Sequence, residues 1–216
     1  MQRLVDGVHS FQEQYFAGRR ALFRRLAERG QRPETLFITC SDSRVDPNRL
    51  CSAEPGEIFI VRNVGNIVPD PSLPGGTAAA IEYAIEVLRV ENVVVCGHTH
   101  CGAIQAVLNP ESMEALPFVK RWLAQTERVR TIVQERYNHL SGDAFTTAAV
   151  AENVLVQLEH LRAFPFVAAG LERGTLRMSG WIFKIETGAV FAFDPAAGQF
   201  VDVAAQSVPP AAPPAR

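Results

Sequence analysis

The chain has 216 residues, of which 47% are hydrophobic and 20% are charged, and its formal net charge is −2. These values suit a soluble globular protein with one domain, large enough to bury a substantial core. A charge this close to zero gives no electrostatic reason to expect nucleic acid or an acidic membrane surface as a partner. The longest apolar stretches are too short and too interrupted to cross a bilayer.

The cysteines and the N-terminal segment indicate the compartment. The segment MQRLVDGVHSFQEQYF has the pattern of an amphipathic helix, without the apolar core and cleavage site of a secretory signal. The four cysteines have no regular spacing and do not form a disulfide framework for a chain of this length. We therefore expect a reducing, cytoplasmic location.

The first quarter of the sequence predicts helical structure followed by a buried strand. Residues 4–26 carry apolar side chains at helical spacing, which predicts one long helix or two short ones ending near Gly30. Residues 35–39 (TLFIT) are an apolar run rich in β-forming residues, so we expect a strand that ends at Cys40. Asp46, followed by a proline, predicts the start of another helix.

Two further apolar runs, 57–62 and 92–96, are typical of buried strands. A loop rich in proline and glycine is expected at 63–76, and a helical pattern begins at Ala78. Strand, helix and strand in this order predict an α/β fold, with a mainly parallel central sheet flanked by helices.

The second half of the chain continues this architecture. Helical patterns cover 113–138 and 143–163, and residues 175–193 predict a pair of strands with a turn at 186–188. We find no internal repeat and no linker, so residues 1–203 are expected to form a single domain. Residues 204–216, rich in proline and alanine, are expected to be a disordered tail.

The segment CGHTHCG at 96–102 carries the chemistry that most needs explanation. His98 and Cys101 offer two metal ligands at a strand-to-helix junction. Two ligands do not hold a zinc ion, and open α/β sheets place their sites at the C-terminal ends of neighbouring strands, where Cys40 is expected. Together these three residues give a Cys₂His set with one position left open, which is the pattern of a catalytic zinc site.

Asp42 and Arg44 follow the first of these cysteines closely. A carboxylate near zinc can accept a proton or can take the open position itself. An arginine can hold the carboxylate away from the metal through a bidentate salt bridge. On their own, two such residues would more often form a surface ion pair of little energetic value.

The remaining cysteines and a second histidine have simpler interpretations. We expect Cys51 and Cys96 to be small buried residues. His100 is expected near the site or on the surface, and not as a ligand. A redox pair of Cys96 and Cys101 stays as an alternative, although it lacks the Cys-x-x-Cys spacing.

The motifs Cys-x-Asp-x-Arg at 40–44 and His-x-x-Cys at 98–101 resemble the two signature segments of the β-class carbonic anhydrases. The surrounding sequence is similar too, and in the same order: VRNVGNIVP at 61–69, IEYA at 81–84 and GWIFKIETG at 180–188. The resemblance covers about residues 1–203 and is strongest to bacterial and cyanobacterial members.

This resemblance implies reversible hydration of CO₂ to bicarbonate and a proton by a zinc-bound hydroxide. It makes Cys40, His98 and Cys101 the ligands of one Zn²⁺ per subunit, and Asp42 and Arg44 the catalytic pair. The residues that it implies for the substrate pocket are Gln31, Phe59, Val64, Tyr83 and Gly102.

The resemblance also implies an assembly. The family is built as an obligate homodimer that often assembles further, with N-terminal helices packed on the partner. It leaves open the oligomer size and whether the protein sits in a bacterial carbon-concentrating compartment.

Several positions depart from patterns found in the family. Some members have an inhibitory bicarbonate site made of Trp, Arg and Tyr. Here Phe37, Arg62 and Phe183 stand in those places, so we expect no such site. Val87 replaces a histidine that resembles a proton shuttle in some plant members, and Ser179 replaces another histidine, so the sequence assigns no route for the proton.

Two alternative functions stay open. A hydrolase of CS₂ or another CO₂ analogue would use the same ligands. A structural zinc protein would have Asp42 as a permanent fourth ligand, which would leave Arg44 without a purpose. Because two thiolates formally cancel the charge of zinc, we expect CO₂ hydration to be favoured on the alkaline side of neutrality.

Overall fold

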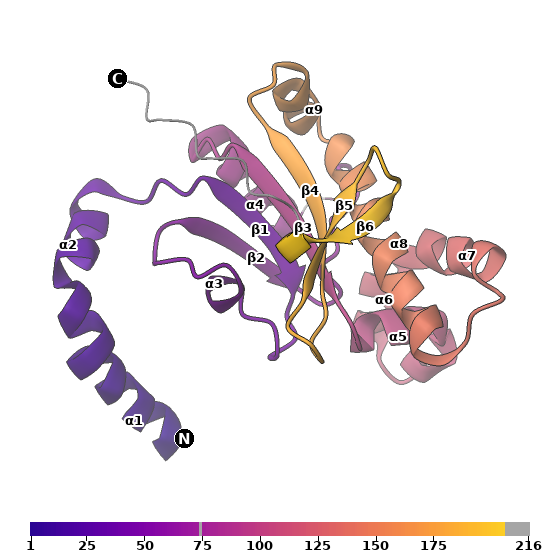
Figure 1. Ribbon diagram of the computed structural model, residues 1–216, viewed down its shortest axis with the longest axis horizontal. Helices are drawn as coiled ribbons and strands as arrows, with labels where there is room; N and C mark the ends of the chain where they lie inside the picture. Colours follow the sequence, from indigo (N-terminus) through magenta and orange to yellow (C-terminus); the bar gives the residue numbers. More distant parts are fainter. Residues whose placement is uncertain (74, 206–216) are drawn as a thin grey trace.

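The computed structural model describes residues 1–73 and 75–205 (Figure 1). In this part of the chain six strands form one sheet, in the order β2-β1-β3-β4-β5-β6. The first four strands in this order run parallel, and the last two are antiparallel additions. The strands are β1 (Thr35–Cys40), β2 (Ile58–Asn63), β3 (Asn92–His98), β4 (Arg177–Phe183), β5 (Val190–Asp194) and β6 (Gln199–Asp202).

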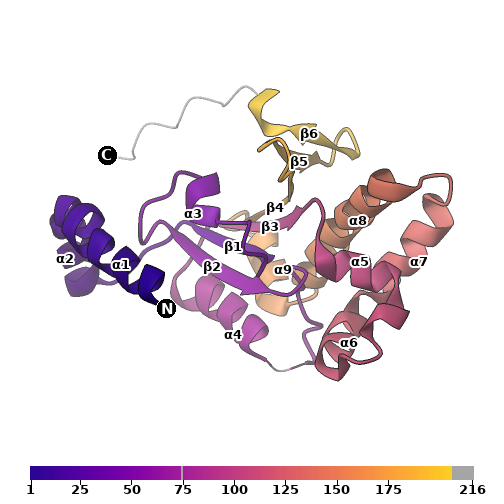
Figure 2. The same ribbon diagram turned by 90° about the horizontal axis from the view of Figure 1, so that it is seen from below.

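Helices cover the two faces of the sheet unequally. Figure 2 shows the short α3 on one side and α4 on the other. The helices are α1 (Gln2–Ser10), α2 (Arg20–Arg29), α3 (Pro47–Leu50), α4 (Gly76–Glu82), α5 (Gly102–Leu108), α6 (Pro117–Leu123), α7 (Glu127–Arg136), α8 (Gly142–Arg162) and α9 (Pro165–Glu172). Short π- and 3₁₀-helical segments extend several of them, among them Phe11–Phe16 and Ala17–Arg19 between α1 and α2, and Tyr83–Val87 after α4.

Alternation along the strands divides the interior into two cores. Leu36 and Val95 belong to the larger core, to which α4, α5, α7, α8 and α9 also contribute. Phe37 and Cys96 point to the opposite face, where a smaller cluster includes Leu50 of α3. Burial on both faces explains why these strands are continuous apolar runs in the sequence.

Helix α8 packs unusually close to the sheet because two strand positions have no side chain. A Cβ atom at Gly97 of β3 would lie 2.9 Å from Val154 Cγ2. A Cβ at Gly180 of β4 would lie 2.7 Å from Val154 Cγ1 and 3.0 Å from Leu158 Cδ1. These glycines therefore set the distance between α8 and the two central strands.

The N-terminal helices stand apart from the rest of the molecule (Figure 1). No residue from the start of α1 to the end of α2 is buried. The main polar link to the domain is Glu54, which accepts hydrogen bonds from Arg19 at 2.8 Å and from the Tyr15 hydroxyl at 3.1 Å.

The predicted α/β class and mainly parallel sheet are confirmed, and each predicted strand is present. Asp46 caps α3 by accepting a hydrogen bond from the Asn48 amide, with Pro47 at the first helical position, as predicted. The helix predicted over 113–138 is divided into α6 and α7 by the 3₁₀ segment Ala124–Thr126. In this segment the Thr126 hydroxyl donates a hydrogen bond to the Leu123 carbonyl at 2.6 Å.

Two elements were not predicted, the helix α9 and the edge strand β6. The predicted C-terminal tail, 204–216, is described only at its first two residues. Ala204 and Ala205 belong to a short 3₁₀ turn, Val203–Ala205, and the domain boundary at residue 203 stays a prediction. The rest of the predicted tail, 206–216, lies outside the described residues.

Within the described residues, no single helix is long and apolar enough to cross a membrane. Helices α8 and α9 reach that length and composition only as a pair, and they meet at a bend of 90°.

The close approach of α8 leads to a stability prediction. Gly180→Ala should lower the free energy of unfolding by about 1–3 kcal/mol, because the added methyl must displace Val154 or Leu158. Gly76→Ala is the matched control, since a Cβ there meets nothing within 4 Å. Chemical denaturation of both variants measures the difference. Equal stability of the two would show that α8 adjusts without strain.

Candidate metal centre

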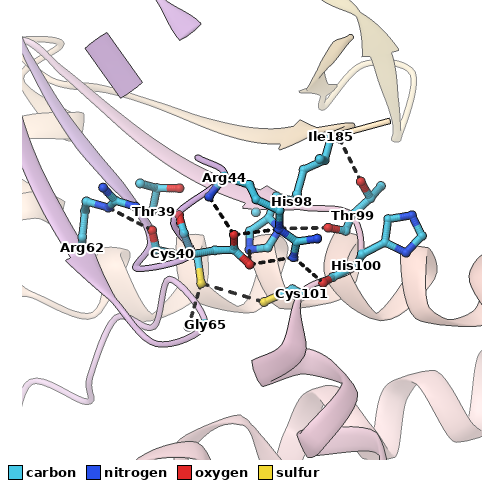
Figure 3. Close-up of polar contacts among 12 residues, drawn as sticks. Thr39, Cys40, Arg44, Arg62, Gly65, His98, Thr99, His100, Cys101 and Ile185 are labelled. Carbon is cyan, nitrogen blue, oxygen red and sulfur yellow. Dashed lines mark hydrogen bonds and ion pairs between the residues drawn. The ribbon is translucent and has the colours of Figure 1, made fainter. Parts of the chain in front are cut away.

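The ends of two adjacent parallel strands bring three metal-binding side chains together. In the β1–β3 ladder Thr39 lies opposite Cys96, so Cys40, one residue on, and His98, two residues on, end their strands at the same edge of the sheet. Cys101 follows as the N-cap residue of α5. Figure 3 shows these side chains converging between the strand ends and the helix.

The donor atoms of Cys40, His98 and Cys101 all lie within 4.8 Å of one another. The two sulfurs are 4.0 Å apart. Two Zn–S bonds of about 2.3 Å at a tetrahedral angle would place sulfurs about 3.8 Å apart. The group is buried and its spacing fits a tetrahedral zinc ion with little adjustment.

His98 presents an unused lone pair to this group. Its Nδ1 lies 2.8 Å from the Thr99 carbonyl oxygen, which can only accept, so Nδ1 carries the proton. Nε2 is therefore a lone-pair donor, and it is buried without a hydrogen-bond partner among the described residues. A buried polar atom left in this state is costly unless a ligand such as a metal ion completes it.

The two thiols also fit a cation. A hydrogen bond from Cys101, with help from the Gly65 amide, lowers the pKa of Cys40 to about 4 despite its burial. The hydrogen-bonded neighbour Cys40 and burial together raise the pKa of Cys101 far above its ordinary value. The Cys40 thiolate is thus stabilised, and its negative charge disfavours ionisation of Cys101. A divalent cation removes this opposition, because it attracts both thiolates.

Asp42 is held beside the metal-binding group by Arg44. The guanidinium donates from Nε to Oδ1 at 2.9 Å and from Nη2 to Oδ2 at 2.7 Å. The same Nη2 donates to the His100 carbonyl at 3.0 Å, which fixes the arginine in turn. Hydrogen bonds from Arg44 lower the pKa of Asp42 well below its usual range, so the carboxylate stays ionised. Its Oδ2 lies 3.8 Å from His98 Nε2.

Comparison with known proteins follows this geometry. The sequence model of the family described as carbonic anhydrase matches residues 35–190. The carbonic anhydrase of Synechocystis is 46% identical over 203 residues, which cover 93% of this chain and 74% of that protein. This chain belongs to the β-class carbonic anhydrases. The members of this class are zinc enzymes that hydrate CO₂, and Cys40, His98 and Cys101 are positioned for the metal.

Solved carbonic anhydrase structures share the fold over nearly the whole chain. The β-carbonic anhydrase CcaA has a TM-score of 0.91 at 46% identity, with 94% of this chain and 91% of that chain covered. A tetrameric β-carbonic anhydrase from Sordaria macrospora has a TM-score of 0.71 at 27% identity, with 94% and 92% covered.

The expected substrate pocket is only partly assembled in one chain of this carbonic anhydrase. The rings of Phe59 and Tyr83 are 6.1 Å apart. Val64 and Tyr83 are 44% and 46% exposed, and Gly102 is exposed at the first position of α5. Gln31 is not brought to the metal centre. It precedes β1, whereas Cys40 ends that strand, and the six residues of the strand span roughly 17 Å.

Arg62 supports the centre in a way that its sequence context did not indicate. Its Nε donates to the Cys40 carbonyl at 3.1 Å and its Nη2 donates to the Asp42 carbonyl at 2.7 Å. The only signal in the sequence was its place near the end of a strand adjacent to β1. The expectation that no inhibitory bicarbonate site forms around Phe37 and Phe183 stays a prediction.

A second unpredicted support comes from the turn between β4 and β5. The Thr99 hydroxyl donates to Glu186 at 2.6 Å and accepts from the Ile185 amide at 3.0 Å. Thr99 also supplies the carbonyl that sets the His98 ring. The turn at 186–188, predicted only as a hairpin connection, therefore braces the metal-binding loop.

The other cysteines and His100 divide between confirmed and wrong expectations. Cys96 is fully buried on the opposite face of the sheet from Cys101, and both are free thiols, so they form no redox pair here. The expectation that Cys51 is buried is wrong: it is the C-cap residue of α3 and is exposed. The His100 side chain is 42% exposed and stands outside the metal-binding group.

Cysteine substitutions test which thiols bind the metal. Cys101→Ser should weaken zinc binding by more than about 100-fold, exceeding the effect of losing an outer-shell partner. Cys51→Ser is the control and should keep one zinc per chain. Metal analysis after dialysis against a chelator gives both values. Full zinc retention by Cys101→Ser would remove this residue from the ligand set.

Proposed function

We propose that this chain catalyses the reversible hydration of CO₂ with Cys40, His98 and Cys101 as the ligands of one zinc ion. The observation that carries the proposal is the pairing of Asp42 with Arg44. The salt bridge keeps the carboxylate outside the group of three donors, so a fourth metal position stays available to water or substrate.

Asp42 and Arg44 are proposed as the catalytic pair. When bound, zinc supplies a Lewis acid that makes water a good nucleophile near neutral pH. The ionised Asp42 would accept a hydrogen bond from the attacking oxygen, orient its lone pair towards carbon and help to move the proton. Arg44 holds the carboxylate in place and, through the His100 carbonyl, ties it to the metal-binding loop.

The same pair supplies a gate. If the salt bridge opened, Asp42 would be free to take the fourth metal position, since its Oδ2 is already 3.8 Å from His98 Nε2. The structural zinc protein considered as an alternative would need this closed arrangement permanently. The intact salt bridge, with three hydrogen bonds from Arg44 to Asp42, favours the catalytic interpretation.

Substrate is proposed to bind against Phe59, Val64 and Tyr83, with the Gly102 amide near the reacting oxygen. These apolar side chains suit CO₂, which has no charge. Because Gln31 lies at the opposite end of β1 from the metal centre of its own chain, we assign its amide to the site of a second copy. The pocket is then completed by dimerisation.

The proposed assembly is a homodimer or a dimer-based larger oligomer. The N-terminal helices carry exposed apolar residues, including Leu4 at 69% and Val8 at 53% exposure. The rings of Phe11 and Phe23 pack on the same arm, 6.1 Å apart and perpendicular. An arm of this kind, without buried residues of its own, suits packing on a partner subunit. The tetrameric relative from Sordaria macrospora supports assembly in general.

The proposed location is the cytoplasm. The sulfurs of Cys40 and Cys101 lie 4.0 Å apart as free thiols, and an oxidising compartment would favour a disulfide over a zinc site.

Hydrolysis of CS₂ or a similar analogue would use the same ligands and differ in the path to the metal. Steady-state assays with both substrates distinguish the two reactions, and CS₂ turnover without CO₂ hydration would contradict our proposal.

The role of Asp42 can be tested with a matched pair of carboxylates. Asp42→Asn should keep its zinc but lower kcat/KM for CO₂ hydration by about 100-fold, because the amide is a poor proton acceptor. Asp46→Asn makes the same chemical change four residues later and should preserve activity, since asparagine caps a helix as well as aspartate. Stopped-flow assays with a pH indicator measure both. Unchanged activity of Asp42→Asn would exclude the proposed role.

The N-terminal arm provides a test of the assembly. Val8→Asp should shift the protein towards monomers and lower CO₂ hydration, because it places a charge in the apolar face and separates Gln31 from the partner's site. Ser10→Asp adds the same charge about 200° around the helix and should leave the oligomer intact. Analytical ultracentrifugation gives the assembly state. A monomeric wild-type protein with full activity would contradict the shared pocket.

A further inference from the structure

The loop between β2 and α4 places a backbone amide on a metal-binding sulfur. The Gly65 N–H donates to Cys40 Sγ at 3.5 Å (Figure 3). Gly65 and Asn66 both have left-handed backbone conformations, with φ of 83° and 48°. Asparagine adopts this conformation more readily than other non-glycine residues, and contacts from two helices hold the loop in it.

One contact acts on the same peptide unit as this N–H group. The indole Nε1 of Trp122, from α6, donates to the Val64 carbonyl at 2.8 Å. In a trans peptide the carbonyl of Val64 and the N–H of Gly65 point in opposite directions. The indole and the sulfur therefore hold the two ends of one peptide plane, and the Trp122 bond aims the amide at Cys40.

A second set of contacts comes from α8. The Asn153 side chain donates to the Gly65 carbonyl at 3.1 Å, and Gln157 accepts from the Val68 amide at 2.8 Å. Gln157 also donates to the Asn153 side-chain oxygen at 2.9 Å, which leaves each amide only one orientation that satisfies its partners. Asn153 and Gln157 are both fully buried.

Two buried amides in a core helix need a reason, because apolar residues of similar size would pack there without the cost of desolvation. Both side-chain amides form their hydrogen bonds with the 64–68 segment and with each other. No other element presents so many buried side-chain bonds to one loop among the described residues. Asn153 fixes the Gly65–Asn66 peptide plane, and Gln157 fixes the Ile67–Val68 plane further along the same segment.

We propose that Trp122 and Asn153 are positioning residues that hold the Gly65 amide on the Cys40 thiolate and so tune the metal centre. An N–H donor withdraws charge from a coordinating sulfur, so less charge is passed to the metal. This counteracts the neutralising effect of two thiolates and leaves the metal a stronger Lewis acid.

The test uses Trp122→Phe and Asn153→Ala, with Tyr137→Phe as control. Trp122→Phe keeps an aromatic ring but loses the N–H donor. The control removes a hydrogen bond of the residue next to Asn153, from the Tyr137 hydroxyl to Glu152 at 2.8 Å, which does not contact the 64–68 segment. Because Asn153→Ala leaves buried groups unpaired and lowers Tm, the partly exposed Trp122 provides the variant that folds normally.

Two readouts report on the sulfur and not on overall stability. In the Co²⁺-substituted proteins, the sulfur-to-metal charge-transfer band should shift to longer wavelength in Trp122→Phe and Asn153→Ala. Zinc affinity, measured by competition with a chelator, should weaken by about tenfold in both, because Cys40 loses an outer-shell partner that orients it for the metal. The control should match the wild type in both measurements.

Two results would overturn the proposal. One is a wild-type spectrum and zinc affinity in Trp122→Phe and Asn153→Ala, whatever their Tm. The other is an equal change in Tyr137→Phe, which would mean that any loosening of α8 disturbs the centre.

Discussion

Backbone hydrogen bonds between β1 and β3 set Thr39 opposite Cys96, and each strand then continues to a metal-binding residue. Alternation along a strand has a period of two, so a slip of one residue would turn Cys40 into the opposite core. The position of Cys101, by contrast, depends on where α5 begins, because this residue is the N-cap of that helix. The metal centre therefore depends on one ladder register and one helix start, and both are set by elements buried in the larger core.

The charges of the site explain much of what surrounds it. Two cysteine sulfurs and one carboxylate meet in a small volume, and their negative charge must be balanced when a metal binds. Arg44 pairs with the carboxylate, while Arg62 binds the carbonyls of Cys40 and Asp42 from the neighbouring strand. Backbone amides at the start of α5 lower the pKa of Cys101, although the thiolate beside it has the larger, opposite effect. The protein thus supplies partial compensation, and the cation supplies the rest.

The sequence was sufficient for the sheet and for the three donors, because apolar strands and metal-binding residue types leave direct local signals. It was insufficient where a residue acts through a distant partner. Arg62 was compared only with a position of an inhibitory bicarbonate site, and nothing local marks Gln157 as a partner of the 64–68 segment. Cys51 was expected to be buried from its residue type, yet it is exposed after α3. Edge strand β6 is short, and its pairing with β5 depends on tertiary placement.

Three features of the isolated chain have one common explanation. The arm formed by α1 and α2 buries none of its own residues, the side chains of Val64 and Tyr83 are nearly half exposed, and Gln31 lies at the opposite end of β1 from the metal centre. Each would be unfavourable or without purpose in a monomer. A second copy would cover the arm, close the pocket and exchange the glutamine between sites. In that arrangement catalysis and assembly would be coupled, because the loop held by Trp122 and Asn153 connects Cys40 to Val64, in the pocket that we propose a partner completes.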